Sequence, residues 1–204
     1  HEFPGSWGGI LDLSGSDEPS LRAAIHEIMR PEGDDQIAWR AGRRMVPRLR
    51  PSPPPVEDEP LVLYPEASYL VTGGLGAIGR RLAAWLAQRG ARHLVLTTRG
   101  QAPAPQDWEE LGTAGDERWR DLAALRARGV EVVVRSSDVA NAQATGKLIA
   151  DFGSKLPALK GVFHAAGVVT PIPGAALRPE DLRQVCASKV AGSWNLHVAC
   201  AALA

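Results

Sequence analysis

The stretch that decides the fold of this chain runs Tyr-Leu-Val-Thr-Gly-Gly-Leu-Gly-Ala-Ile-Gly from residue 69 to residue 79. It begins as a short apolar run, turns through glycines and then enters a helical pattern, which predicts a strand, a tight loop and a helix. Gly73, Gly76 and Gly79 stand at G-x-x-G-x-x-G spacing, so the backbone can turn sharply and approach a pyrophosphate closely. The helix N-terminus would present free N–H groups to the phosphates. Such glycine turns also occur without a ligand, so the residues that follow must decide.

The second strand ends in Thr-Thr-Arg-Gly at residues 97–100, and Arg99 stands 20 residues after Gly79. Proteins that bind NAD place an Asp or Glu at this point to hold the ribose 2′-hydroxyl. Arg99 would instead pair with a 2′-phosphate through charge-assisted hydrogen bonds, which favours NADPH. The alternative interpretation is a solvated surface arginine. Asp138 follows the third strand in Ser-Ser-Asp-Val and could meet the adenine, although taken alone it is better explained as a turn aspartate.

Strand and helix patterns alternate through the rest of the chain. Beyond the glycine loop, strands are predicted at 93–97, 130–135 and 159–166, and helices at 82–90, 108–128 and 140–152. A long helix is predicted to run unbroken from Pro179 through Leu182, Val185, Val190 and Leu196. This alternation predicts an α/β fold with a Rossmann-like, doubly wound parallel sheet that is only partly contained in the chain.

The first 50 residues form a different pattern. A buried strand is predicted at 7–13, a helix with one apolar face follows and ends at Pro31 and Gly33, and a hairpin is predicted at 36–49 around Ala41-Gly42. This βαββ piece has too few apolar residues to close a core of its own. The connector after it, rich in proline and acidic residues, should be extended. The expected domains are therefore 1–50, a linker at 51–66 and a nucleotide-binding domain at 67–204.

The composition excludes several classes of function. The chain has 204 residues with 23 basic and 23 acidic side chains, so no charge excess indicates nucleic acid or a membrane surface. No apolar run is long enough to span a bilayer and no signal peptide is recognised, which predicts a cytoplasmic protein. Cys186 and Cys200 lie 14 residues apart, about 21 Å along one helix, too far for a disulfide. No metal site is predicted.

Five motifs in order resemble the ketoreductase domain of modular type I polyketide synthases, which belongs to the short-chain dehydrogenase/reductase superfamily. They are Thr-Gly-Gly-Leu-Gly-Ala-Ile-Gly at 72–79, Leu-Val-Leu-Thr-Thr-Arg-Gly at 94–100, Ser-Asp-Val-Ala at 137–140, His-Ala-Ala-Gly-Val at 164–168 and Ser-Lys-Val-Ala-Gly-Ser-Trp-Asn-Leu-His at 188–197. The βαββ piece resembles the end of the structural subdomain that precedes the catalytic one in that family. The resemblance covers nearly the whole chain.

The resemblance implies NADPH-dependent reduction of a β-ketoacyl thioester, carried on the phosphopantetheine of an acyl carrier protein, to the β-hydroxyacyl product. The cofactor-binding residues it implies are Thr72, Gly73, Gly74, Leu75, Gly76, Ile78 and Gly79 at the pyrophosphate, Thr98 and Arg99 at the 2′-phosphate, Asp138 and Val139 at the adenine, and Ala165, Ala166 and Gly167 at the nicotinamide ribose. Lys189 matches the catalytic lysine of the family, whose charge orients the cofactor and lowers the pKa of a neighbouring tyrosine. Without the family, Lys189 would be interpreted as a surface helix lysine.

Two departures from the family pattern bear on activity. The catalytic serine and tyrosine of the family are expected beyond Ala204, so the chain is expected to be an internal piece of a larger synthase and inactive alone. Val169-Thr170-Pro171 stands where one stereochemical class carries Leu-Asp-Asp, which argues against that class. Expected partners are the acyl carrier protein, neighbouring synthase domains and the remainder of the reductase domain. The alternatives are a non-catalytic reductase-like scaffold of a megasynthase and, less favoured, a stand-alone dehydrogenase or epimerase.

Overall fold

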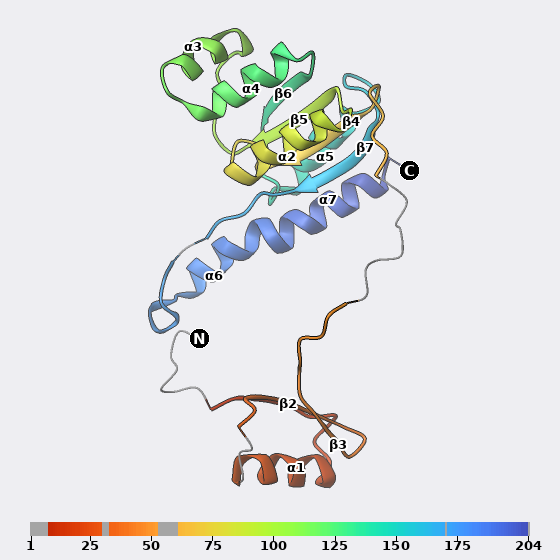
Figure 1. Cartoon of the computed structure of the whole chain (residues 1–204), viewed down its shortest axis with the longest axis vertical. Helices are drawn as coiled ribbons and strands as arrows, with labels where there is room; N and C mark the ends of the chain where they lie inside the picture. The colour runs from red at the N-terminus through yellow and green to blue at the C-terminus, as the bar shows by residue number, and fades with distance from the viewer. Residues whose placement is uncertain (1–7, 30–32, 53–60, 170, 204) are drawn as a thin grey trace. The chain divides into compact units, whose positions relative to one another are not determined.

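The computed structural model describes residues 8–29, 33–52, 61–169 and 171–203. The chain divides into two compact units, residues 1–59 and 60–204 (Figure 1). The division falls within the predicted linker, half of which, residues 53–60, lies outside the described residues.

The second unit contains a four-stranded parallel sheet in the order β6-β5-β4-β7. Its strands are β4 (Ser68–Thr72), β5 (His93–Thr98), β6 (Glu131–Ser136) and β7 (Leu159–His164). The order reverses beside β4, because β5 lies on one side of it and β7 on the other. A parallel sheet whose order reverses at its first strand is a doubly wound, Rossmann-like sheet, so the predicted fold class is confirmed. The carboxyl ends of β4 and β7 meet at this switch point, where such sheets bind ligands.

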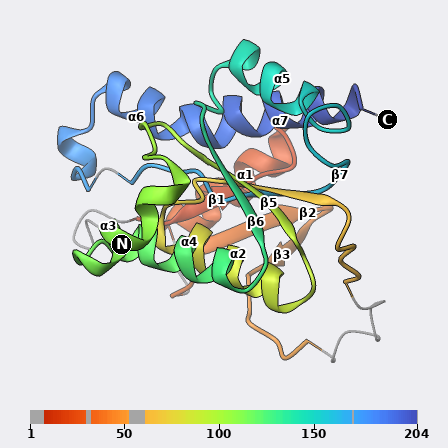
Figure 2. The ribbon, with the colours of Figure 1, turned by 90° about the horizontal axis from the view of Figure 1, so that it is seen from above.

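Helices cover both faces of the sheet, and each face has its own apolar core (Figure 2). On one face, α2 (Ala77–Gln88) and α4 (Glu117–Ala127) pack Leu86 and Leu122 against Val71 and Leu96. On the other face, α5 (Ala142–Ala150) and α7 (Gly192–Ala201) pack against the alternate strand residues, and the core includes Leu70, Val95, Ile149 and Leu196. Successive strand residues point to opposite faces, which explains why nearly every residue of β4 and β5 is apolar or fully buried.

The predicted helix at 108–128 is wrong as a single element. The chain instead forms α3 (Trp108–Thr113), preceded by the short 3-10 turn Pro105–Asp107, and then α4. Gly115, at a φ of 107°, separates the two helices, because only glycine adopts that backbone conformation without strain. The two helices pack through Trp108 and Trp119, whose ring centroids lie 5.8 Å apart.

The long helix predicted from Pro179 is also interrupted. It consists of α6 (Pro179–Cys186), a π-helical turn (Ala187–Ala191) and α7, and a 3-10 turn (Gly174–Ala176) precedes it. Leu182, which lies in α6 before the π-helical turn, is 53% exposed. Cys186 and Cys200, on either side of this turn, are both free thiols, and burial raises the pKa of the Cys200 thiol.

The first unit contains the predicted βαββ order. Its elements are β1 (Ile10–Asp12), α1 (Glu18–Met29), β2 (Gln36–Arg40) and β3 (Arg43–Met45), with β1 parallel and β3 antiparallel to β2. The hairpin turns at Ala41 and Gly42, both with positive φ, as a two-residue turn requires. The first strand is shorter than predicted and largely exposed rather than buried, and Trp7 lies outside the described residues.

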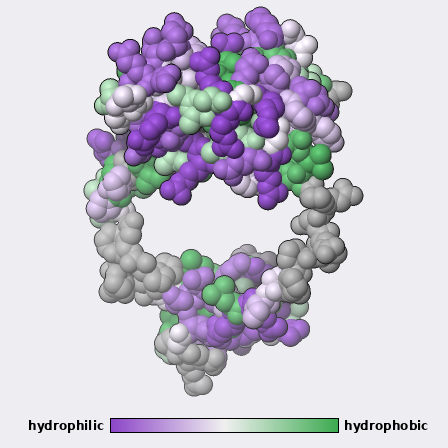
Figure 3. All heavy atoms as spheres, turned by 45° about the horizontal axis from the view of Figure 1, so that its top comes forward, coloured by the Kyte–Doolittle hydropathy of each residue, from purple (hydrophilic) through white to green (hydrophobic). Residues whose placement is uncertain are grey.

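The apolar face predicted for α1 is real, but it does not pack within this unit. Ile25 is 61% and Ile28 74% exposed, and hydrophobic side chains stand among hydrophilic ones on the visible face of the unit (Figure 3). The helix buries Glu27 instead. Its carboxylate accepts hydrogen bonds from Trp39 Nε1 at 3.0 Å and from Arg44 Nε at 2.8 Å. Bonded to both strands of the hairpin, Glu27 fixes the helix to the sheet through charge rather than through apolar contact.

We expect Glu27→Gln to destabilise this unit by about 1–3 kcal/mol, because the partly buried Arg44 guanidinium then faces a neutral amide. Arg44 holds the pKa of the Glu27 carboxyl below its usual value. The stabilisation is therefore present above the unfolded-state pKa and is lost as the pH falls through the lower folded-state pKa. Amide-exchange protection in residues 36–45 is the measurement. Glu18→Gln, which removes only an exposed ion pair with Arg22, is the control; equal protection in the two variants would contradict the assignment.

Candidate functional site

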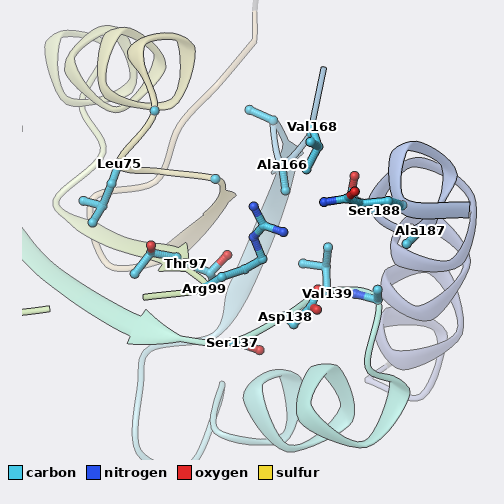
Figure 4. A pocket seen from close by; sticks show the side chains of 17 residues that line it. Leu75, Thr97, Arg99, Ser137, Asp138, Val139, Ala166, Val168, Ala187 and Ser188 are labelled. Carbon is cyan, nitrogen blue, oxygen red and sulfur yellow. Dashed lines mark hydrogen bonds between the residues drawn. The ribbon is translucent and has the colours of Figure 1, made fainter. Parts of the chain in front are cut away.

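A cavity of about 380 Å³ opens at the carboxyl ends of the strands, between the loops that follow them (Figure 4). Four of its walls follow β4, β5, β6 and β7, and the fifth is the helix after β7. The lining residues are Gly73, Leu75, Gly76, Thr97, Thr98, Arg99, Ser137, Asp138, Val139, Ala140, Ala165, Ala166, Gly167, Val168, Gln184, Ala187 and Ser188. Ten of the residues predicted to bind a cofactor are among them, so the fold brings together segments that are almost 100 residues apart.

The glycine loop is packed too closely for side chains. A Cβ on Gly73, whose φ is 64°, would lie 2.8 Å from Ala166 Cα. A Cβ on Gly79 would lie 2.4 Å from the carbonyl oxygen of Gly73 and 2.7 Å from Gly74 Cα. These neighbours are backbone atoms, which cannot rotate away. The glycines therefore allow the loop to fold back over the start of α2 while it lies against the segment after β7.

The start of α2 faces the cavity without a capping side chain. Gly76 is the N-cap, and no side chain caps the helix there. The first N–H groups of an α-helix have no partner within the helix, so they can accept an anion at the floor of the cavity. Thr72, Gly74, Ile78 and Gly79, also predicted to contact a cofactor, do not line the cavity; Thr72 is fully buried beneath the loop and the Ile78 side chain is 73% exposed.

Arg99 extends from the end of β5 into the cavity (Figure 4). Its side chain makes no ion pair within the described parts of the chain, and it is exposed. Thr98, beside it, accepts a hydrogen bond from the backbone N–H of Gly100 at 3.3 Å. An unpaired guanidinium at the edge of an open cavity is available to an anionic ligand.

Asp138 and Val139 form the turn after β6. The Asp138 carboxylate accepts a hydrogen bond from the backbone N–H of Ala140 at 3.0 Å, so this residue has the turn role that its sequence context indicates. Val139 is buried, and its carbonyl accepts hydrogen bonds from Asn195 Nδ2 at 2.9 Å and Thr145 Oγ1 at 3.2 Å. These contacts fix the turn to α5 and α7 while Asp138 stays exposed at the cavity.

Lys189 lies in the π-helical turn, next to the cavity rather than in its lining. Its Nζ donates hydrogen bonds to the carbonyls of Val168 at 2.9 Å and Val185 at 3.4 Å. Val168 lines the cavity, as do Ala165, Ala166 and Gly167 before it. The ammonium therefore stands at the end of β7, beside the wall predicted to meet the nicotinamide ribose.

Several residues that line the cavity were not among the predicted site residues. They are Thr97, Ser137, Ala140, Gln184, Ala187 and Ser188. The hydroxyls of Ser137 and Ser188 are buried and have no hydrogen-bond partner among the residues that the structure describes. Ser137 precedes Asp138 within a quoted motif, so proximity could have found it. Ala187 and Ser188 face the cavity from the π turn, which helical periodicity does not predict.

The described residues contain no group of three or more His, Cys, Asp or Glu side chains that could hold a metal ion. Among the same residues, no helix has both the length and the apolar character needed to cross a membrane.

Residues 67–203 match the family model of the KR domain. The chain is 38% identical to the erythronolide synthase EryA3 of Saccharopolyspora erythraea, over 98% of this chain and 6% of that protein. It is 36% identical to one of the subunits of the phenolphthiocerol/phthiocerol polyketide synthase of Mycobacterium tuberculosis, over 96% of this chain and 11% of that protein. The chain thus spans only about a tenth or less of the length of these relatives.

Solved structures share the fold. A structure of A-type ketoreductases from a modular polyketide synthase is 34% identical, with a TM-score of 0.74, over 99% of this chain and 41% of that chain. The ketoreductase PlmKR1 from the first module of phoslactomycin biosynthesis in Streptomyces sp. HK803 is 28% identical, also with a TM-score of 0.74, over 97% of this chain and 43% of that chain.

Proposed function

Because the chain belongs to the ketoreductase (KR) domain family of modular polyketide synthases, we propose that it forms the cofactor-binding part of a reductase for β-ketoacyl thioesters. In this proposal NADPH is the reductant, an acyl carrier protein presents the substrate, and the product is the β-hydroxyacyl thioester. Neighbouring synthase domains are the other partners. The observation that carries the proposal is the cavity in which the glycine loop, Arg99 and the segment after β7 meet.

The residues of the cavity fit a phosphorylated dinucleotide. Gly73 and Gly76 leave the backbone without side chains at the floor, and the uncapped start of α2 would receive the pyrophosphate. Thr98 and Arg99 would hold the 2′-phosphate, and Asp138 with Val139 would receive the adenine. The buried, unpartnered hydroxyl of Ser137 adds a polar contact at that end, because a buried hydroxyl without a partner is destabilising until a ligand satisfies it.

NADPH, when bound, supplies the hydride. The residues of this chain would bind the cofactor and set its orientation. The glycine loop and Arg99 would anchor its phosphates, and Ala165, Ala166 and Gly167 would support the nicotinamide ribose. Lys189 places a positive charge at the end of β7, where it would favour negative charge that develops on the substrate oxygen and assist a tyrosine that donates the proton. That tyrosine is part of the family pattern, and no tyrosine is among the described residues that line the cavity.

The competing proposal is a scaffold that keeps the fold without catalysis. A scaffold has no physical need for an unpaired Arg99, for buried Ser137 and Ser188 hydroxyls without partners, or for a lysine bonded to two backbone carbonyls beside a cavity. The two buried hydroxyls cost stability unless a ligand uses them, so they favour the enzyme. Oxidation of NADPH that depends on an added β-ketoacyl thioester, followed by absorbance in the complete reductase domain, tests the function. Cofactor binding with no reduction of any such thioester would favour the scaffold.

We expect Arg99→Ala to weaken NADPH binding by about 1.5–3 kcal/mol, the range for a hydrogen bond to a charged group, and to leave NADH binding little changed. The reason is that only NADPH carries the 2′-phosphate that Arg99 would pair with. Fluorescence titration of both cofactors against the 204-residue chain measures the two dissociation constants. Arg120→Ala, which removes an exposed arginine of α4, is the matched control and should change neither constant. Equal losses for NADPH and NADH would contradict the role of Arg99.

A further inference from the structure

His164, the last residue of β7, connects the ends of two strands with the turn that carries Lys189. Its Nδ1 lies 2.6 Å from the hydroxyl of Thr72, the residue paired with it across the sheet. The same hydroxyl accepts a hydrogen bond from the backbone N–H of Ala166 at 3.2 Å. On the other side of the ring, Nε2 lies 2.9 Å from the carbonyl oxygen of Ser188. We call Thr72, His164 and Ser188 the hydrogen-bond relay.

The partners of the relay determine the form of the imidazole. The Ser188 carbonyl can only accept, so Nε2 must carry a hydrogen and donate it. The Thr72 hydroxyl already accepts from Ala166, and Thr72 is fully buried, so its own proton needs a nearby acceptor. Nδ1 supplies that acceptor only when it is unprotonated. The neutral imidazole with hydrogen on Nε2 satisfies every group in the relay.

The relay ends at the residue before Lys189. Ser188 and Lys189 belong to the π-helical turn, whose irregular backbone is fixed by contacts outside the helix rather than by helical periodicity. Lys189 is bonded in turn to the carbonyl of Val168, four residues beyond His164 on the same segment. The segment after β7 therefore holds the turn at two points, through the His164 ring and through the lysine itself.

We infer that His164 is a positioning residue: its neutral ring holds the π-helical turn so that Lys189 stands at the nicotinamide end of the cavity. This inference rests on the proposed function, in which Lys189 assists reduction. It also replaces the role predicted for Thr72: its hydroxyl bonds to His164 and Ala166 and does not contact a cofactor. Displacing a charged group by about 1 Å can cost on the order of 10²-fold in rate, so the position of the turn matters to the reaction.

Two variants separate the two ends of the relay. His164→Asn keeps an acceptor near Nδ1 for Thr72 but is too short to reach Ser188, whereas His164→Gln places an amide N–H near Nε2 and gives up the Thr72 acceptor. In the complete reductase domain we expect His164→Asn to lower kcat about 10- to 50-fold, while the NADPH dissociation constant changes less than about threefold. We expect kcat of His164→Gln to remain at least about fivefold higher than that of His164→Asn. His197→Asn, on the exposed face of α7, is the control and should match the unaltered domain.

A double variant distinguishes positioning from a purely structural role. If His164 acts through Lys189, His164→Asn should lower kcat by no more than about threefold further in a Lys189→Met background. A full additional loss there, or a His164→Gln variant slower than His164→Asn, would overturn the inference.

The relay also has a readout that needs no activity. In the 204-residue chain labelled with ¹⁵N-histidine, two-bond proton–nitrogen spectra should show His164 neutral with its hydrogen on Nε2, and a signal with the hydrogen on Nδ1 would overturn the inference. If the unaltered domain reduces no β-ketoacyl thioester, the proposed function fails, while these ring signals still decide whether the relay exists.

Discussion

We expect Lys189→Met in the complete reductase domain to lower the rate of β-ketoacyl reduction on the order of 10²-fold or more while NADPH affinity and the fold are largely kept. Lys189 is exposed and its side chain fills no core position, so its loss should not unfold the domain. Its ammonium is held between two backbone carbonyls beside the cavity, where charge develops during reduction. Removing a charge used in proton transfer affects the rate rather than binding.

Steady-state rates with NADPH and a β-ketoacyl thioester, measured across pH, check this expectation. The loss should be largest near neutral pH, because an unassisted tyrosine with a pKa of about 10 is then poorly matched to the operating pH. Lys147→Met is the matched control, since Lys147 is an exposed lysine near the end of α5 and away from the cavity. A Lys189→Met rate within about threefold of the unaltered domain would make Lys189 a surface residue and leave the proposed mechanism without a catalytic group in this chain.

The parts of the site that the sequence predicted are those in which the residue type is dictated by local geometry. A strand that turns at once into a helix over a phosphate needs glycine where a Cβ would meet backbone, so Gly73 and Gly79 could be found from spacing alone. The position of Arg99 could be predicted because β5 pairs with β4, so its carboxyl end lies beside the glycine loop, as the second strand does in dinucleotide-binding sheets.

The π-helical turn shows what the sequence could not supply. The spacing of Leu182, Val185, Val190 and Leu196 suits one continuous helix, but a π-helical turn interrupts it and Leu182 is exposed. The turn instead has a partner distant in the chain, because Nε2 of His164 lies 2.9 Å from the carbonyl oxygen of Ser188. Just after the turn, Asn195 of α7 donates a hydrogen bond to the carbonyl of Val139. Tertiary hydrogen bonds of this kind leave no periodic signal, so Ser188 could not be placed at the cavity from its sequence.

The first unit gives a second example. The spacing of the apolar residues of α1 predicted a packed face, and the helix does form, but its apolar side chains are exposed and a carboxylate is buried. Periodicity identifies the face of a helix that is apolar; it does not identify the surface that covers it. Glu27 is buried because Trp39 and Arg44, 12 and 17 residues later, bond to it, and no pattern in α1 itself contains that information.

We expect Gly79→Ala to weaken NADPH and NADH binding equally, by at least about tenfold, and to destabilise the second unit by about 1–3 kcal/mol. The added methyl group would lie 2.4 Å from the Gly73 carbonyl oxygen and 2.7 Å from Gly74 Cα, so the loop must move away from the start of α2. Because the pyrophosphate is common to both cofactors, the loss differs from that of Arg99→Ala, which is confined to NADPH. Titration of both cofactors and thermal unfolding of the 204-residue chain measure the two effects.

Gly146→Ala is the matched control for this substitution. Gly146 lies inside α5, and a Cβ there would have no atom within 4 Å, so the same methyl group should stabilise the helix by about 0.5–1 kcal/mol and leave both cofactors bound as before. The two variants add the same methyl group to the same unit, but the expected changes in its stability have opposite signs. The comparison therefore separates the general effect of replacing a glycine from the effect of the close contact in the loop. If Gly79→Ala bound both cofactors within about threefold of the unaltered chain and unfolded at the same temperature, the loop would have room for a side chain. The close approach of backbone to phosphate, on which the cofactor assignment depends, would then be wrong.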